Sequence, residues 1–255
     1  MLPFINIFGI QIPMYGVCLV TGIAVAVIMA VLKCKRKGLE WENVFIISFV
    51  AIGLGLFGAR VVFLLITYSP NELWRIFSTG NWSLIAKSGL VFYGGLIFGI
   101  IGAFFGAKIA GVRLLDYEHV LTPYLPLAHA FGRIGCLFAG CCYGKETDSI
   151  FSVVYETPLS DAPTNLPLIP VQLYEAALNL ILFFWLSKRS KNKNSPLLAT
   201  YLCAYAIIRF LIEFLRFDTV RGIWNGFSTS QWISIVMFAM GIFLLLVKTK
   251  RTSNK

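Results

Sequence analysis

The chain has 255 residues, of which 58% are hydrophobic, 15% aromatic and only 13% charged, and its formal net charge is +10. Soluble domains have about 45–50% apolar and about 25% charged residues, so this composition excludes a soluble globular enzyme. A disordered chain is excluded as well, because it would need low hydrophobicity and a high density of charge. The sequence therefore predicts an integral membrane protein.

Seven apolar windows of about 20 residues, the length that crosses a bilayer, predict an all-α polytopic protein with seven transmembrane helices. In chain order the windows are approximately residues 12–32, 43–68, 89–111, 119–139, 171–187, 197–217 and 229–247. No basic residue precedes the first window and no small-residue cleavage site follows it, so we expect a retained helix and no signal peptide. We expect residues 1–255 to form a single membrane domain.

Basic residues alternate between the connections of these windows. Of the 22 Lys and Arg residues, 14 lie in or beside the first, third and fifth connections and the C-terminal tail, and four lie in the other connections. Cytoplasmic loops carry the excess of basic residues, so we expect the N-terminus outside and the C-terminus in the cytoplasm. Residues 69–88 and 140–170 are then extracytoplasmic loops, and the net charge needs no nucleic-acid partner.

The two long outer loops are expected to contain local structure. Residues 69–88 carry Trp74 and Trp82 in an amphipathic pattern typical of a helix at the membrane interface. Residues 140–170 contain four prolines, which leave room only for a short strand, expected at residues 151–155. A loop of this length is typical of a functional lip or lid.

Charged side chains inside the windows are the strongest functional signal, because charge in the hydrocarbon region is costly and usually marks a substrate path. In the fourth window, His129, Arg133 and Cys136 share one helix face. Glu175 lies at the start of the fifth window. Arg60 lies near the outer end of the second, where its side chain can snorkel to the surface.

The sixth window carries Arg209, Glu213 and Arg216 at positions i, i+4 and i+7, so the three share a helix face. Guanidinium groups suit phosphate, because their planar fork donates two hydrogen bonds and stays charged. Arginines in an apolar cavity therefore favour a phospholipid head group as ligand. The alternative is an ion network that only joins helices, although such a network is costly to bury.

Several short motifs resemble those of the prolipoprotein diacylglyceryl transferases, in the same order along nearly the whole chain. They are Pro13-Met14-Tyr15-Gly16, Gly58-Ala59-Arg60, Phe92-Tyr93-Gly94-Gly95-Leu96, Gly132-Arg133-Ile134-Gly135 with Gly140 and Tyr143-Gly144, Pro170-Val171-Gln172-Leu173-Tyr174-Glu175, and residues 209–216. The resemblance implies the seven-helix fold and orientation of that family. It also implies a multi-pass protein of the bacterial cytoplasmic (inner) membrane.

The resemblance implies an enzyme that transfers the diacylglyceryl group of phosphatidylglycerol to the lipobox cysteine thiol of a prolipoprotein and releases glycerol phosphate. Its partners would be the phospholipid, the prolipoprotein signal-peptide region and the membrane, and no metal or dissociable cofactor is expected because the lipid is the donor. The candidate catalytic residues are Arg133, Arg209, Tyr93 and His129. The candidate substrate-binding residues are Tyr15, Arg60, Gly94, Gly95, Gly135, Cys136, Gly144, Gln172, Tyr174, Glu175, Tyr205, Glu213 and Arg216. Two of these, Arg133 and Arg209, are expected to stabilise the leaving phosphate.

The chain departs from the family's motifs at three positions. Tyr93 stands where the family has a histidine, and a phenol is a poorer base than an imidazole near neutral pH. Cys136 stands where the family has an asparagine, and Ile169 where it has another histidine. His129, one helical turn before Arg133, is either a substitute base or a hydrogen-bonded core histidine.

Three cysteines, Cys136, Cys141 and Cys142, lie near the outer end of the fourth window. Nothing nearby in the sequence completes a four-ligand zinc set. We expect small buried thiols that fill helix contacts, with a transient acceptor thiol or a redox pair as alternatives.

Two other functions are compatible with the same residues. A divergent phospholipid-dependent transferase would keep the arginine clamp and use another acceptor. A non-catalytic membrane protein would use the arginines to bind or transport an anionic lipid. The sequence shows no internal symmetry of two related halves, which is the feature that would favour a transporter.

Overall fold

The computed structural model describes residues 3–7, 9–80, 89, 91–192, 194–217 and 222–253. The chain forms two compact units, Met1–Ala30 with Glu118–Lys255 and Val31–Tyr117, and the boundary between them falls inside the first helix. The described residues are mostly helical, with short two-stranded antiparallel sheets. Each unit is considered separately below.

The first unit contains most of the helices. Its elements are β1 (Phe4–Ile7), β2 (Ile10–Pro13), the first part of α1 (Met14–Arg36), α6 (Glu118–Leu121), α7 (Tyr124–Ala139), β3 (Val153–Val154), β4 (Pro167–Leu168), α8 (Val171–Arg189), α9 (Leu197–Ile212), the 3₁₀ helix η2 (Glu213–Leu215), β5 (Ile223–Trp224), β6 (Phe227–Ser228) and α10 (Thr229–Ser253). The second unit contains α2 (Trp41–Thr67), α3 (Pro70–Ser78), α5 (Phe92–Ile109) and the 3₁₀ helix η1 (Leu114–Tyr117).

Four helical stretches in the described part of the chain are long and apolar enough to cross a membrane. They are Met14–Arg36, Trp41–Thr67, Leu197–Leu215 and Thr229–Val247, and the bent pair Tyr93–Ile109 and Leu114–Leu121 would add a fifth. Every predicted window contains a helix, but α7 and α8 are not among these stretches. Helix α7 has only 16 residues, and α8 carries three buried polar residues that make it less apolar, Gln172, Glu175 and Asn179.

Apolar and charged side chains are distributed as expected for a protein surrounded by lipid. Large apolar residues are exposed along the helices, for example Phe49, Phe104, Phe184 and Phe243. Several charged residues are buried, including Arg209 and Glu213. A protein that faces hydrocarbon has no reason to hide its apolar side chains, whereas its charges must find partners inside.

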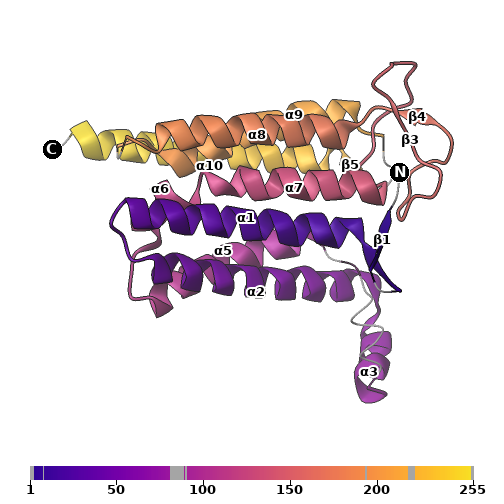
Figure 1. Ribbon diagram of the computed structural model, residues 1–255, viewed down its shortest axis with the longest axis horizontal. Helices are drawn as coiled ribbons and strands as arrows, with labels where there is room; N and C mark the ends of the chain where they lie inside the picture. The colour runs from indigo at the N-terminus through magenta and orange to yellow at the C-terminus, as the bar shows by residue number, and fades with distance from the viewer. Residues whose placement is uncertain are drawn as a thin grey trace. The chain divides into compact units, whose positions relative to one another are not determined.

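In the first unit, α7, α8, α9 and α10 pack consecutively, each against the next (Figure 1). Small residues permit the close approach of the helices. A Cβ atom on Gly135 of α7 would lie 3.2 Å from Tyr15 of α1, and one on Gly241 of α10 would lie 2.5 Å from the Cys203 sulfur of α9. A buried cluster that includes Leu186 and Leu197 joins α8 to α9.

The second unit is built on the packing of α2 against α5 (Figure 1). Glycines lie on both sides of this contact: a Cβ atom on Gly55 of α2 would lie 3.2 Å from the Gly95 carbonyl oxygen of α5. Helix α3 begins with a capping box, in which the Ser69 hydroxyl accepts from the Glu72 N–H and the Glu72 carboxylate accepts from the Ser69 N–H. Helix α3 confirms the prediction of a helix in the second connection. Trp82, which belongs to the same predicted segment, lies outside the described residues.

Replacing Gly102 with alanine is expected to destabilise the α2–α5 contact. A Cβ atom there would lie 2.8 Å from both the Ala51 Cα and the Val50 carbonyl oxygen, and backbone atoms cannot rotate away. Overpacking of this kind costs about 1–3 kcal/mol. Thermal unfolding in detergent should show a lower midpoint than that of the matched variant Gly53→Ala, whose Cβ has open space around it. Equal midpoints for the two variants would contradict this packing.

The loop after α7 contains the expected short strand and also ends α9. Strand β3 pairs with β4, which confirms a strand within residues 151–155. The Lys145 N–H donates to the Leu215 carbonyl oxygen, and the Phe217 N–H donates to that of Tyr143. Helix α9 ends at Ile212, the 3₁₀ helix η2 follows, and Arg216 lies beyond it in extended backbone, paired with Gly144. The expectation that Arg216 shares a helix face with Arg209 was therefore wrong, because the α-helix gives way to a 3₁₀ turn and Arg216 itself has extended backbone.

The small sheets are the main departure from an all-α fold. Strands β1 and β2 form a hairpin in which Ile5 faces Ile12, and β5 pairs with β6. Asn225 and Gly226, which connect β5 and β6, both have positive φ angles, +47° and +80°. Asn-Gly is the preferred pair for a tight hairpin turn of this kind, so the signal was present in the sequence.

Candidate functional site

A buried ion pair joins α7 to α8 in the first unit. Glu175, in the first turns of α8, is only 1% exposed, and its Oε2 atom lies 3.1 Å from the Nε atom of Arg133 on α7. One turn earlier on α7, the Nε2 atom of His129 accepts a hydrogen bond from the same Arg133 nitrogen at 3.2 Å. The face of α7 predicted to carry both residues therefore points at α8.

A second arginine reaches the same carboxylate from α9. The Nη1 atom of Arg209 lies 4.0 Å from Glu175 Oε2, and its Nη2 atom lies 2.8 Å from Glu213 Oε2. Glu213 also pairs with Arg216 at 3.5 Å. The structure thus brings Arg133 and Arg209 to a single oxygen atom of Glu175, although they come from helices that are not consecutive.

Uncharged side chains complete this network. The Tyr205 hydroxyl on α9 donates to Glu175 Oε1 at 3.2 Å, and its ring lies 4.9 Å from that of His129, centroid to centroid. The Nδ2 group of Asn179 donates to the Glu175 carbonyl oxygen, and Ser230 of α10 accepts from Arg209 Nη2 at 2.8 Å. Four helices therefore contribute to one buried polar layer.

The charges in this network do not cancel. It contains three arginines and two carboxylates, so the formal excess is one positive charge with His129 counted as neutral. The members of this arginine cluster are Arg133, Arg209, Arg216, Glu175 and Glu213. The buried Nη1 atom of Arg209 has no hydrogen-bond partner among the described residues. An unused buried donor next to excess positive charge favours an anionic ligand, and guanidinium groups bind phosphate well.

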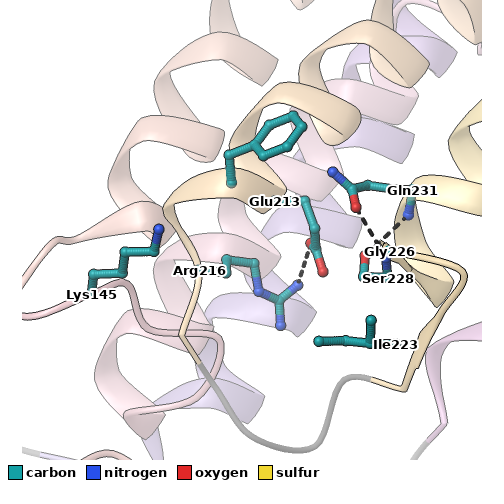
Figure 2. Close-up of a pocket in the computed structure, with 8 residues that line it drawn as sticks. Lys145, Glu213, Arg216, Ile223, Gly226, Ser228 and Gln231 are labelled. Atoms are coloured by element: carbon teal, nitrogen blue, oxygen red, sulfur yellow. Dashed lines mark hydrogen bonds and ion pairs between the residues drawn. The ribbon is translucent and has the colours of Figure 1, made fainter.

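A pocket of about 180 Å³ opens beside the Glu213–Arg216 end of the cluster (Figure 2). It adds Lys145, a further cation, from the loop after α7. On its other side the Ser228 N–H donates to Gln231 Oε1, and the Gln231 N–H donates to the Ser228 hydroxyl, a reciprocal cap at the start of α10. Of the arginines in the cluster, Arg216 lines this pocket, so an anionic group in it would contact Arg216 and Lys145.

Gln172 and the cysteines adjoin the cluster along α7 and α8. The sulfur atoms of Cys136, Cys141 and Cys142 all lie within 4.8 Å of one another. Gln172, one turn before Glu175, donates from Nε2 to the Cys141 carbonyl oxygen at 2.7 Å. These thiols are the described group of side chains best suited to a metal ion, and sequence reasoning missed it because spacing alone did not show that the sulfurs converge.

Other predicted site residues in this unit have packing positions. A side chain on Gly135 would press on Tyr15, which places Tyr15 against α7. Gly144 has no room for a side chain, because a Cβ atom would lie 2.7 Å from the Ile169 carbonyl oxygen. Tyr174 is exposed, on a different face of α8 from the buried Glu175.

Four predicted residues belong to the other unit. Arg60 lies on α2, and Tyr93, Gly94 and Gly95 lie in the first turns of α5. A Cβ atom on Gly94 would lie 2.5 Å from the Gly58 carbonyl oxygen, so this glycine permits the close contact of α5 with α2. The predicted role of these four residues in the site stays a prediction.

Sequence reasoning missed several members of the site. Asn179 follows Glu175 by one helical turn, so the polar face of α8 could have shown it. Ser230 and Lys145 had no such signal, because a lone serine or an exposed lysine is common at helix ends and in loops. Only the tertiary arrangement brings them to the arginines.

Comparisons with known proteins identify the family of the chain. A family model described as prolipoprotein diacylglyceryl transferase matches residues 3–247. A phosphatidylglycerol–prolipoprotein diacylglyceryl transferase of Clostridium tetani is 32% identical over 241 residues, which cover 94% of each chain. The corresponding transferase 2 of Clostridium perfringens is 33% identical over 248 residues, or 94% of this chain and 92% of that protein. The chain therefore belongs to the prolipoprotein diacylglyceryl transferase family.

Proposed function

We propose that the chain transfers the diacylglyceryl group of phosphatidylglycerol to the lipobox cysteine thiol of prolipoproteins and releases glycerol phosphate. The names of the relatives state this donor, acceptor and transferred group. The observation that carries the proposal is the meeting of Arg133 and Arg209 at Glu175, with a buried donor of Arg209 left unused. This arrangement suits the phosphate of an anionic lipid whose acyl chains lie in the membrane.

The reaction requires stabilisation of a leaving phosphate. The thiolate of the acceptor attacks the glycerol carbon that carries the phosphate ester, a carbon–sulfur bond forms, and the carbon–oxygen bond breaks. The electron pair stays on the phosphate oxygen, so negative charge grows there. Arg133 and Arg209 are proposed to bind this charge in a site with little water, where fixed donors act strongly. Glu175 acts as a positioning residue that holds both guanidinium groups.

His129 is better suited to positioning than to proton removal. Its Nε2 atom already accepts a hydrogen bond from Arg133, so that atom is not available to take a proton from a thiol. We therefore propose that His129 orients Arg133, with Tyr205 against its ring.

We also propose the topology of the intact protein. The single membrane domain would have seven spans, with α7 and α8 as the shorter and more polar ones, in the bacterial cytoplasmic membrane. The N-terminus would lie outside and the C-terminus inside, which the alternation of basic residues supports. The outer loops would then meet the signal-peptide region of the prolipoprotein.

The decisive assay measures glycerol phosphate released from radiolabelled phosphatidylglycerol with and without a lipobox peptide. We expect release only when the peptide carries its cysteine, and a peptide with serine in its place is the matched control. Release without any peptide would instead indicate a transferase with another acceptor. Binding of the lipid without release would indicate a non-catalytic lipid-binding protein, and either result would overturn the proposal.

A further inference from the structure

The three thiols beside the arginine cluster form a site of their own. Cys136 lies in the last turn of α7, and Cys141 and Cys142 follow the helix directly. Their three sulfur atoms lie within 4.8 Å of one another, and each residue is half-buried. Cysteines that only filled helix contacts would not need to point at a common centre.

The backbone holds this arrangement firmly. Gly140 ends α7 in the left-handed conformation, with φ of +71°, and the Cys141 N–H then donates back to the Cys136 carbonyl oxygen at 3.2 Å. Cys142 itself has φ of +61°, which is unfavourable for a residue other than glycine. Gln172 fixes the Cys141 carbonyl oxygen from α8. The sulfur atoms therefore converge in a structure that holds Cys142 in an unfavourable backbone conformation.

Charged groups and a helix end surround the three thiols. Arg133 and Arg216 both act electrostatically on the Cys142 sulfur as positive charges. Helix α7 also directs its C-terminal end, the negative end of its dipole, at this position. Three thiolates and a divalent ion carry a net charge of only −1.

We propose that Cys136, Cys141 and Cys142 bind a zinc-class divalent metal ion, and that the open fourth position of the ion takes the acceptor thiol. Zinc–sulfur bonds of about 2.3 Å in a tetrahedron place sulfur atoms about 3.8 Å apart, so the sulfurs need to move by about 1 Å at most from the observed spacing. Thiolate ligands select zinc-class ions. Three protein ligands with one open position are typical of catalytic zinc sites, whereas structural sites are closed by four.

This site would supply what the chain lacks at the family's histidine position. A thiol that coordinates such an ion gives up its proton to solvent, and no general base at Tyr93 is then required. The bound thiolate attacks the glycerol carbon of the lipid, the carbon–oxygen bond breaks, and glycerol phosphate leaves with the electron pair. Two negative charges, one on the thiolate and one on the phosphodiester, become the two charges of the phosphate monoester. The role in transfer rests on the function proposed above, whereas metal binding does not.

The binding test uses Co²⁺ as a spectroscopic probe for the full-length chain, reduced and then freed of reductant in detergent. We expect one Co²⁺ per chain, with sulfur-to-cobalt charge-transfer absorption and the visible bands of a tetrahedral ion. Cys141→Ser and Cys142→Ser should each lose these bands. The control Cys203→Ser, whose cysteine lies on α9 and is not one of the three thiols, should keep them. Thermal unfolding of each variant checks that it folds. The site is refuted if the folded wild-type chain shows no such bands, or if the bands persist in Cys141→Ser and Cys142→Ser.

The acceptor test adds a lipobox peptide to the Co²⁺-loaded chain. The peptide with its cysteine should shift the cobalt bands, and the serine peptide should not; an unchanged spectrum with both would refute the acceptor role. Chelation should lower glycerol phosphate release about 30-fold, because an ordinary cysteine has about 30 times more thiol than thiolate at pH 7, and Zn²⁺ should restore it. Full release from metal-free protein would overturn the inference and leave the proposed function intact. If the cobalt bands respond to the peptide thiol but no glycerol phosphate is released, the metal site stands and the proposed function is wrong.

Discussion

Replacing Arg133 with glutamine is expected to lower the rate of glycerol phosphate release by about 10²–10³-fold. Arg133 is one of the two guanidinium groups that meet at Glu175, and removal of one fixed donor at a developing negative charge has an effect of this size. The measurement is kcat/KM for phosphatidylglycerol at saturating lipobox peptide. Glutamine keeps much of the length of arginine, so the loss would report on charge and hydrogen bonding more than on packing.

The matched control for this substitution is Arg113→Gln. Arg113 makes an ion pair with Asp116, but its side chain is 83% exposed, and exposed pairs contribute little. We expect the control variant to keep the wild-type rate. A loss at Arg133 of less than tenfold, in protein that folds normally, would show that its guanidinium group does not act on the leaving phosphate.

Replacing Glu175 with glutamine is expected to cost about 3–5 kcal/mol of unfolding free energy, because the change leaves buried guanidinium groups without their shared partner. Glu175 also accepts from Tyr205, so the loss extends from α7 to α9. Since whole domains are stable by only about 5–15 kcal/mol, the thermal unfolding midpoint in detergent should fall sharply. Transfer activity should fall with it, because both arginines lose the group that positions them.

An exposed glutamate provides the comparison for this variant. Glu156 lies on the loop after α7 and is exposed, so Glu156→Gln makes the same chemical change without removing a buried partner. We expect its unfolding midpoint to match that of the wild type. If Glu175→Gln unfolded at the same temperature as Glu156→Gln, the ion network would contribute nothing to stability, and the positioning role would be wrong.

Much of the helical arrangement could be predicted because lipid-facing helices have a simple composition. Each apolar window contains a helix, and the family inferred from the motifs is confirmed by the match over residues 3–247. The ends of the helices were harder to predict. Arg216 falls outside α9 because distant residues 143–145 pair with residues 215–217, and such pairing leaves no local signal in the sequence.

The charged residues of the site could be found from sequence because charge within an apolar window is rare. The residues with which they form ion pairs could not all be found in this way. Helical spacing predicted the pair Arg209–Glu213, which the structure has at 2.8 Å, but it gave no means of knowing that Arg133 would share Glu175 with Arg209. The convergence of the thiols likewise depends on two residues with positive φ, Gly140 and Cys142.

The most direct test of the account is a double-mutant cycle on glycerol phosphate release. If Arg133 and Arg209 bind one phosphate, Arg133→Gln and Arg209→Gln should each remove most of the benefit of the pair. The double variant should then lose no more than about tenfold beyond the worse single variant, since groups that act as a unit are not additive. As a control, the effects of Arg133→Gln and Arg113→Gln on the rate should multiply, because these residues act independently. If the rate losses of Arg133→Gln and Arg209→Gln also multiply in the double variant, the two arginines act independently, which contradicts the shared phosphate site.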